Sequence, residues 1–208
     1  ADLVFFIGCG TGDQPTNNWL VPSIETPIVQ IDIDPLELGR TYPNTAGLIG
    51  DPKRTLQELI SLLVEPVSDN AFSQWAYDLV KNWRTDQASL LTSSNIPICP
   101  DRLCAEISNL LPEDGILLSD TGYSGIWTST LIELNGTSQT YLRAAGSLGW
   151  SFPASLGAKC AAPKRKVICF CGDGAMYYHL SELETARRRN LDVVIVINNN
   201  SGFGQGWP

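Results

Sequence analysis

Two short polar clusters follow two strongly apolar runs near the carboxyl end of the chain. The run 167–171 (VICFC) ends in Gly172–Gly174 (GDG), and the run 193–197 (VVIVI) ends in Asn198–Asn200 (NNN). Short runs that are apolar throughout are typical of buried parallel strands. A helix-forming stretch separates the two runs, which predicts a right-handed β-α-β unit with both clusters at one edge of a sheet.

The same alternation of strands and helices extends along the whole chain. It predicts an α/β fold with two doubly wound parallel-sheet units, whose ligands gather at the carboxyl ends of the strands. In the first unit we expect strands at 3–7, 28–33 and 47–50, with helices beginning at Pro35 and Pro52. In the second we expect strands at 115–119, 140–142, 167–171 and 193–197, with helices at 101–111, 125–134, 153–160 and 175–188.

Proline and polar residues between the two units indicate a connecting region. We expect the first unit at 1–65, a connection at 66–100 and the second unit at 101–208. The connection contains one amphipathic helix, whose apolar face carries Phe72, Trp75, Ala76, Leu79 and Trp83. A strand begins almost at the first residue and the chain stops soon after the Asn cluster, so we expect a piece of a longer polypeptide.

Composition excludes several classes of partner. The chain of 208 residues has a net charge of −8 and a pI of about 4.6, which argues against nucleic acid as a partner. Its basic run, 187–189, ends a predicted helix, where cations complement the helix dipole. No apolar stretch approaches the ~20 residues that span a bilayer, so we expect no membrane partner. Six cysteines without a Cys-x-x-Cys pair or a secretory leader fit reduced thiols in a cytoplasmic protein.

Oxygen donors dominate the two polar clusters. Asp173 offers a carboxylate and Asn200 a side-chain carbonyl, hard ligands that suit Mg²⁺ or Ca²⁺. Mg²⁺ takes few protein oxygens and completes its shell with phosphate oxygens and water. Gly174 lets a phosphate approach the backbone, and free N–H groups at the start of the next helix favour an anion. The clusters therefore predict a metal-bridged diphosphate site.

Three segments resemble the thiamine diphosphate-dependent enzymes, in the acetolactate synthase-like and 2-keto acid decarboxylase group. The first is Gly172–Gly174 followed by Asn200, which lies 27 positions after Asp173. The second is 31–35 (IDIDP) with Gly39-Arg40, which is similar to that group's central domain. The third is 142–157 (LRAAGSLGWSFPASLG), which is similar to the segment around the cofactor ring. The resemblance covers nearly the whole chain, as part of a central domain and most of a diphosphate-binding domain.

The resemblance implies a set of site residues. Mg²⁺ is expected on Asp173, Asn200 and the backbone carbonyl of Gly202. The carbonyl of Gly146 is expected to accept a bond from the 4′-amino group of the cofactor. Leu148 is expected to be the apolar wedge that bends the cofactor, which brings that amino group beside the thiazolium C2–H. The remaining residues expected to contact the cofactor are Gly122, Tyr123, Ser124, Gly172, Gly174 and Ala175, the last of which replaces a Ser of many relatives.

The resemblance also implies an activity for the complete protein. The implied activity is decarboxylation or carboligation of a 2-keto acid, which are reactions of a lyase or transferase. The complete protein is expected to be a homodimer or homotetramer. No catalytic residue is expected in this chain, because the activating Glu comes from an N-terminal pyrimidine-binding domain of the same or a partner subunit. This fragment alone is therefore expected to be inactive, and Gln205 is expected to face the substrate.

Several other interpretations remain open. The complete protein is alternatively a simple 2-keto acid decarboxylase or a non-catalytic nucleotide-binding regulatory module. The loop Gly8–Gly12 with Asp32 resembles a dinucleotide fingerprint, although Asp13 stands where that fingerprint needs Gly, so FAD stays the less favoured cofactor. Leu148 is alternatively a core residue, and Tyr123 with Ser124 an ordinary helix start. His179, the single histidine, is expected to be a structural residue or one just behind the site, and alternatively faces the cofactor.

Overall fold

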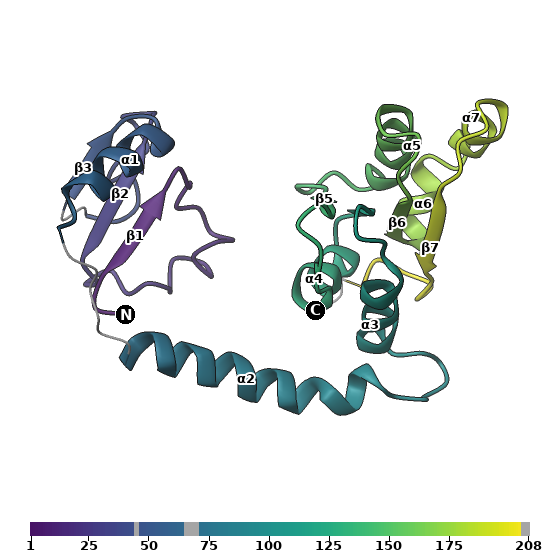
Figure 1. Ribbon diagram of the computed structural model, residues 1–208, viewed down its shortest axis with the longest axis horizontal. Coiled ribbons are helices and arrows are strands. Elements are labelled where there is room, and N and C mark those ends of the chain that lie inside the picture. The colour runs from purple at the N-terminus through teal and green to yellow at the C-terminus, as the bar shows by residue number, and fades with distance from the viewer. Residues whose placement is uncertain (44–45, 65–70, 205–208) are drawn as a thin grey trace. The chain divides into compact units, whose positions relative to one another are not determined.

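Two separate parallel sheets organise the chain (Figure 1). The computed structural model describes residues 1–43, 46–64 and 71–204. They divide into two units, Ala1–Ala71 and Phe72–Pro208. Each sheet is parallel throughout, and helices separate the successive strands of the second sheet, which confirms the predicted α/β class. In the first sheet the helix α1 follows the last strand.

The first unit is a three-stranded sheet in the order β1-β2-β3. Its elements are β1 (Val4–Ile7), β2 (Ile28–Asp32), β3 (Ala46–Ile49) and α1 (Pro52–Leu62). The middle strand carries the buried side chains Ile28 and Ile31. Helix α1 begins as predicted, because the Asp51 carboxylate accepts the N–H of Arg54 at 3.0 Å and Pro52 needs no hydrogen-bond acceptor.

The short helix predicted at Pro35 is instead a series of turns. Asp34 N–H donates to the Asp32 carboxylate, and Leu36 N–H donates to the Asp34 carboxylate, both at 2.9 Å. The buried Gln30 side chain binds Glu37 O at 3.0 Å and Gly39 N at 3.1 Å. These side-chain bonds occupy backbone groups that a helix would need, so Asx turns replace it.

The second unit is a four-stranded sheet in the order β5-β4-β6-β7. Its strands are β4 (Ile116–Ser119), β5 (Thr140–Arg143), β6 (Val167–Gly172) and β7 (Val194–Asn198). Its helices are α2 (Ala71–Leu91), α3 (Pro100–Leu110), α4 (Tyr123–Leu131), α5 (Ser151–Ala161), α6 (Asp173–Tyr178) and α7 (Glu182–Arg188). Helix α2 is the helix predicted between the units, and none of its residues is buried.

Helices cover both faces of the second sheet. On one face, Phe152 and Leu156 of α5 pack with Cys169 and Cys171 of β6. On the other face, the apolar side chains of α3 and α4 pack against the two central strands, β4 and β6. The residues of this second cluster are Ile107, Leu111, Leu117 and Phe170, with Leu103, Trp127 and Ile132 around them. Alternate residues of β6 thus face opposite helix layers, as a central strand requires.

The single helix predicted at 175–188 is two helices. Helix α6 ends at Tyr178, where His179 leaves the helical region with φ −133° and ψ 31°. Gly149 lies against this helix end, since a Cβ at Gly149 would come within 2.7 Å of Tyr178 Cβ and 3.1 Å of His179 Cδ2. The break coincides with this tertiary contact, which the apolar periodicity of the sequence does not reveal.

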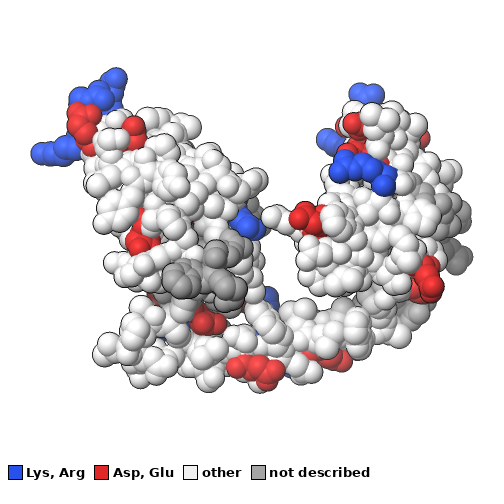
Figure 2. All heavy atoms as spheres, turned by 180° about the vertical axis from the view of Figure 1, so that it is seen from behind, with Lys and Arg blue, Asp and Glu red and all other residues white. Residues whose placement is uncertain are grey.

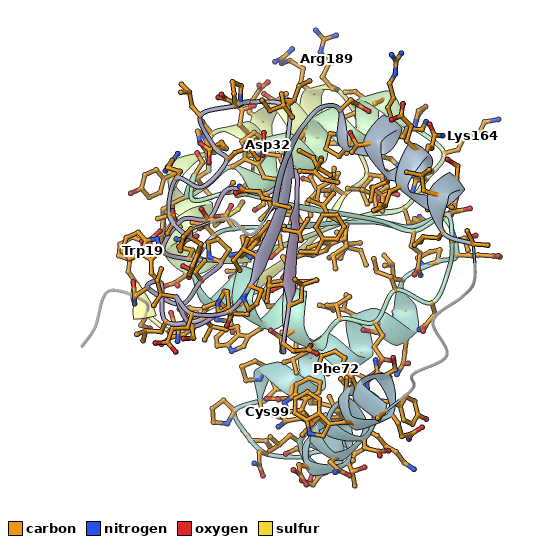
Figure 3. The ribbon with its side chains drawn as sticks, turned by 90° about the vertical axis from the view of Figure 1, so that its left-hand side faces the viewer. Trp19, Asp32, Phe72, Cys99, Lys164 and Arg189 are labelled. Carbon is orange, nitrogen blue, oxygen red and sulfur yellow. The ribbon has the colours of Figure 1, made fainter. Side chains whose placement is uncertain are left out.

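The surface carries few charges. On the face shown in Figure 2, most of the surface is uncharged, and acidic and basic side chains occur in small separate groups. The predicted basic run ends α7, where Arg188 pairs with Glu184 at 2.9 Å and Arg189 points away from the ribbon (Figure 3). All six cysteines are free, and Cys160 is exposed. Within the described residues, no helix is both long and apolar enough to cross a membrane.

Candidate functional site

The strand order of the second sheet creates one crevice at the carboxyl ends of its strands. The chain runs from β4 outward to β5 and then crosses over to β6 on the other side of β4. Helix α4, which follows β4, and helix α5, which follows β5, therefore cover opposite faces of the sheet. The loops after β4 and β6 diverge at this switch point, where open α/β sheets bind ligands.

A cavity of about 220 Å³ occupies this position. Of the eleven predicted site residues, ten line it and Gly146 does not. The ten are Gly122, Tyr123, Ser124, Leu148, Gly172, Asp173, Gly174, Ala175, Asn200 and Gly202. Gly146 is exposed, with φ +97°, two positions before Leu148. The cavity thus joins four chain segments that are distant in sequence, those around Tyr123, Leu148, Gly174 and Gly202.

The loop after β4 forms the first wall. Gly122 has φ 80° and ψ −154°, a conformation that side chains disfavour, and α4 begins at the next residue. Ser124 is buried, and Gly125 N–H donates to Gly122 O at 3.1 Å. The ring of Tyr123 stacks on Trp127 with centroids 5.4 Å apart. The turn therefore holds two hydroxyl groups, those of Tyr123 and Ser124, at the cavity.

The turn from β6 into α6 forms the second wall. Gly172 ends the strand, Asp173 opens the helix, and Ala175 is buried. Phe203 lies against Gly174, since a Cβ there would collide with the Phe203 ring. The first N–H groups of a helix have no acceptor inside it, so this turn offers hydrogen-bond donors to the cavity.

The segment after β7 forms the third wall. Asn198 ends the strand and lines the cavity with Asn200, whereas Asn199 does not line it. The Asn199 side chain instead accepts the N–H of Ser201 at 3.0 Å, in a turn where Ser201 has φ 59°. This turn sends Asn200 and Gly202 back toward the end of β6.

Three oxygen-bearing groups meet between the second and third walls. Asn200 Oδ1 accepts the N–H of Gly202 at 3.3 Å. Exchanging the amide oxygen and nitrogen of Asn200 would place a donor 2.7 Å from Gly202 O and 3.3 Å from Asp173 Oδ1. The position that Oδ1 occupies thus faces a carbonyl and a carboxylate. Oxygens at these distances repel one another unless an amide N–H or a cation lies among them.

A buried carboxylate links the first wall to the segment that carries Leu148. Asp120 is fully buried, and its two oxygens accept the N–H groups of Thr121 at 3.0 Å, Gly149 at 2.9 Å and Ser151 at 2.8 Å. Leu148 is half-buried, lines the cavity and packs against the α5 side of the core. The wedge and core interpretations of Leu148 are therefore compatible.

Sequence reasoning missed several residues of the site. Thr121, Asn198, Phe203 and Gly204 line the cavity. Asp120 does not line it but binds the backbone of Gly149 and Ser151, which follow the cavity residue Leu148. Asn198 and Thr121 adjoin predicted site residues, so their position at a strand end was the available signal. The role of Asp120 has no local signal, because its partners lie 29 and 31 positions away.

His179 and the cysteines lie outside the cavity. His179 ends α6 and contacts the Gly149 backbone, which agrees with the structural interpretation of this histidine. The hydrogen bond that the Cys171 thiol donates to Cys169, together with burial, raises the pKa of Cys171. Burial also raises the pKa of Cys104 to about 12. These buried thiols stay protonated near neutral pH, which favours packing over nucleophilic chemistry.

The glycine loop of the first unit lies at the carboxyl end of β1. Gly8 has φ +55°, and the Glu37 carboxylate lies about 4.0 Å from where a Gly10 Cβ would be. Asp32 ends β2 (Figure 3), and its carboxylate accepts the N–H of Asp34 at 2.9 Å. The Glu37 carboxylate thus lies near this loop, and its negative charge disfavours a pyrophosphate there. Gln205 lies outside the described residues.

Comparisons with known proteins match both units. Residues 1–59 match the thiamine pyrophosphate enzyme central domain, and residues 120–205 match the C-terminal TPP binding domain of the same enzymes. The chain is 30% identical over 206 residues to the acetolactate synthase large subunit of Buchnera aphidicola subsp. Acyrthosiphon pisum (strain APS). It is 26% identical over 209 residues to the acetolactate synthase isozyme 3 large subunit of Escherichia coli (strain K12). Each alignment covers 98% of this chain and 36% of the relative, so the chain spans about a third of these relatives.

Proposed function

Because the chain belongs to the thiamine pyrophosphate enzyme family, we propose that its second unit binds thiamine diphosphate through Mg²⁺. The observation that carries this proposal is the meeting of Asp173, Asn200 and Gly202 in a cavity at the switch point of the sheet. We further propose that 1–65 is part of a central domain, 66–100 a connection and 101–208 a diphosphate-binding domain. The family matches at 1–59 and 120–205 support this division.

The donor set fits Mg²⁺. A carboxylate, a side-chain carbonyl and a backbone carbonyl are hard oxygen ligands, and the cavity adds no thiolate or imidazole among its described residues. A cation beside Asn200 Oδ1 would remove the oxygen–oxygen repulsion without exchanging the amide. Asp173, Asn200 and Gly202 would then hold the metal, and phosphate oxygens and water would complete its shell.

Two turns would hold the diphosphate. Gly172, Gly174 and Ala175 offer a backbone without bulky side chains at the start of α6. Gly122, Tyr123 and Ser124 offer N–H and hydroxyl groups from the opposite wall. Ala175 supplies no hydroxyl, so this chain relies on backbone donors where a serine would add one more contact.

The segment 142–157 would orient the ring end of the cofactor. Leu148 presents an apolar side chain to the cavity, and the carbonyl of Gly146 would accept the cofactor's amino group. When bound, thiamine diphosphate supplies an acidic carbon and an electron sink for cleaving the bond beside a keto group. Holding the cofactor bent is the contribution of this chain to that chemistry.

We propose a 2-keto acid as the substrate of the complete protein, with carboligation after decarboxylation as the reaction. The names of the relatives, acetolactate synthases, support this choice over simple decarboxylation. No glutamate lines the cavity among the described residues. We therefore propose that an N-terminal pyrimidine-binding domain, of the same or a partner subunit in a homodimer or homotetramer, supplies the activating Glu.

Calorimetric titration tests the binding proposal. Thiamine diphosphate is titrated into the natural polypeptide that contains this chain, with and without Mg²⁺, and ADP and FAD are titrated in parallel. We expect binding of thiamine diphosphate that requires Mg²⁺ and is lost in Asp173→Ala. Binding of ADP or FAD alone, unchanged in Asp173→Ala, would instead establish a nucleotide-binding regulatory module.

A further inference from the structure

Asp120 is a buried carboxylate at the end of β4. None of its surface is exposed, and its own N–H donates to Phe170 O of β6 at 3.0 Å. Within the described residues it forms no ion pair. Its negative charge is balanced by the backbone N–H groups of Thr121, Gly149 and Ser151 at 2.8–3.0 Å. Such charge-assisted bonds are stronger than those between neutral groups, so these three positions are tightly fixed.

The bonds from Asp120 hold the segment that carries Leu148. Gly149 follows Leu148 directly, and Ser151 opens α5. At its other end the segment is tied to the sheet, because Ala144 N–H donates to Ser119 O at 3.1 Å. Leu148 thus lies between two anchors, both at the carboxyl end of β4.

Gly149 is confined from the opposite side as well. It has φ +86°, and a Cβ there would lie 2.7 Å from Tyr178 Cβ and 3.2 Å from Ala175 O. The Gly149 backbone is therefore enclosed between the Asp120 carboxylate and helix α6. Little freedom remains for the position of Leu148, which directly precedes Gly149 and lines the cavity.

We propose that Asp120 is a positioning residue that sets the depth of Leu148 in the cavity through Gly149 and Ser151. This inference rests on the proposed binding of thiamine diphosphate. The carboxylate itself does not touch the cofactor. Its effect is on the bend of the cofactor, because a wedge that retreats lets the amino group move away from the thiazolium C2–H.

A merely structural role for Asp120 makes a different prediction. In that case its loss lowers stability, whereas the cofactor that does bind keeps its geometry. The exchange of the C2 proton of bound cofactor with solvent distinguishes the two roles, because it depends on the distance between the amino group and C2–H. Exposure of the segment 144–151 in the free protein gives a second readout that needs no cofactor.

The experiment compares Asp120→Asn, Asp120→Glu and Leu148→Ala in the natural polypeptide that contains this chain. Asp120→Asn keeps the shape but turns an NH₂ group toward a backbone N–H, and Asp120→Glu keeps the charge but moves the oxygens by one methylene. The matched control is Asp114→Asn, an exposed aspartate before the start of β4. Proton NMR of quenched samples in D₂O measures C2–H exchange at saturating thiamine diphosphate and Mg²⁺. Hydrogen-exchange mass spectrometry follows peptides that span 144–151.

We expect both Asp120 variants to slow C2–H exchange by roughly 10- to 100-fold, as Leu148→Ala does. The peptides that span 144–151 should exchange at least about tenfold faster, since three backbone N–H groups lose or share their acceptor. The affinity for magnesium-bound cofactor should change less, because the proposed metal ligands and the diphosphate-binding turn at the start of α6 lie in segments that Asp120 does not bond. Combining Asp120→Asn with Leu148→Ala should slow exchange no further than the slower single variant.

Unchanged C2–H exchange in variants that bind the cofactor would overturn this proposal alone. Failure of both Asp120 variants to fold would also overturn it, since the residue would then be structural. If the unmodified protein does not bind thiamine diphosphate with Mg²⁺, the proposed function fails, and the inference about Asp120 fails with it.

Discussion

Gly172 pairs with Asn198 at the last rung of the β6–β7 ladder. The residues that follow the two strands, Asp173 and Asn200, therefore emerge at the same edge of the sheet. Parallel pairing in this register places the carboxylate and the amide within 3.3 Å of each other. A shift of register would separate them, so the ladder decides whether a metal site can form.

Removing the carboxylate should abolish magnesium-dependent binding. Asp173→Asn is expected to raise the dissociation constant for thiamine diphosphate in the presence of Mg²⁺ by about 100-fold or more, because it removes the one anionic ligand. Asp192→Asn is the matched control, since that exposed aspartate only pairs with Lys166 at 3.3 Å. Isothermal titration calorimetry checks both, and equal affinities in the two variants would exclude Asp173 as a ligand.

A side chain at Gly122 should destabilise the fold. Its φ of 80° and ψ of −154° disfavour any Cβ, so Gly122→Ala is expected to lower the free energy of unfolding by about 1–3 kcal/mol. Gly157→Ala is the control, because Gly157 lies inside α5 with open space at its Cβ. That change should raise the free energy of unfolding by ~0.5–1 kcal/mol. Urea denaturation measures both, and equal losses would contradict the conformational argument.

A buried hydroxyl supports the first wall of the site. Thr128 Oγ1 donates to Ser124 O at 2.7 Å and lies within hydrogen-bond distance of two further hydroxyls, Ser119 Oγ at 2.7 Å and Tyr141 OH at 2.9 Å. Thr128→Val keeps the volume but leaves these partners without their hydrogen bonds. It should therefore lower the free energy of unfolding by about 1–3 kcal/mol. Thr130→Val, on the exposed side of α4, should change it by less than ~0.5 kcal/mol. Indistinguishable denaturation midpoints for the two variants would show that this hydrogen-bond network contributes little to the free energy of unfolding.

Stability should fall in alkaline solution partly through Cys104. Burial raises the pKa of this thiol from its ordinary value of 9.0 to about 12, so the folded state keeps a proton that the unfolded state releases. The contribution is complete below pH 9 and is lost as the pH rises toward 12. In that window the free energy of unfolding should fall by up to about 1.4 kcal/mol per pH unit.

Cys104→Ala isolates this contribution. The variant starts from a lower stability, because it leaves a cavity beside α3, but its dependence on pH should be shallower between pH 9 and 12. Denaturant unfolding at a series of pH values gives, for each protein, the slope of the free energy of unfolding against pH. Parallel slopes for the two proteins would show that Cys104 ionises in the folded state as readily as in the unfolded state.

Residues that follow strands could be found from the sequence because strand ends are visible in it. The apolar runs before Gly172 and Asn198 predicted two adjacent parallel strands, which the structure confirms. The two strand ends then predicted that Asp173 and Asn200 lie at one edge of the sheet, and both residues line the cavity. The exception is Gly146, which lies in an irregular segment and outside the cavity lining. No periodicity determines where such a segment turns.

Two features of the fold could not be found in this way. Apolar spacing predicts one helix at 175–188. The structure has two helices instead, and the first ends before His179, where the chain contacts Gly149. Pro35 predicts a helix start, yet the buried Gln30 side chain binds the backbone that a helix would use. In each case a partner from another part of the chain competes with a local preference and prevails.

The sequence by itself determined the α/β class, the order of the strands along the chain and the residue types at the strand ends. Hydrophobic period and glycine placement are local properties, so they can be read without tertiary contacts. The tertiary structure alone decided that β6 lies beside β4, that Asn200 turns toward Asp173, and that Asp120 reaches Gly149. The physical reason is that burying a charge or pairing a strand depends on partners that only the folded chain brings together.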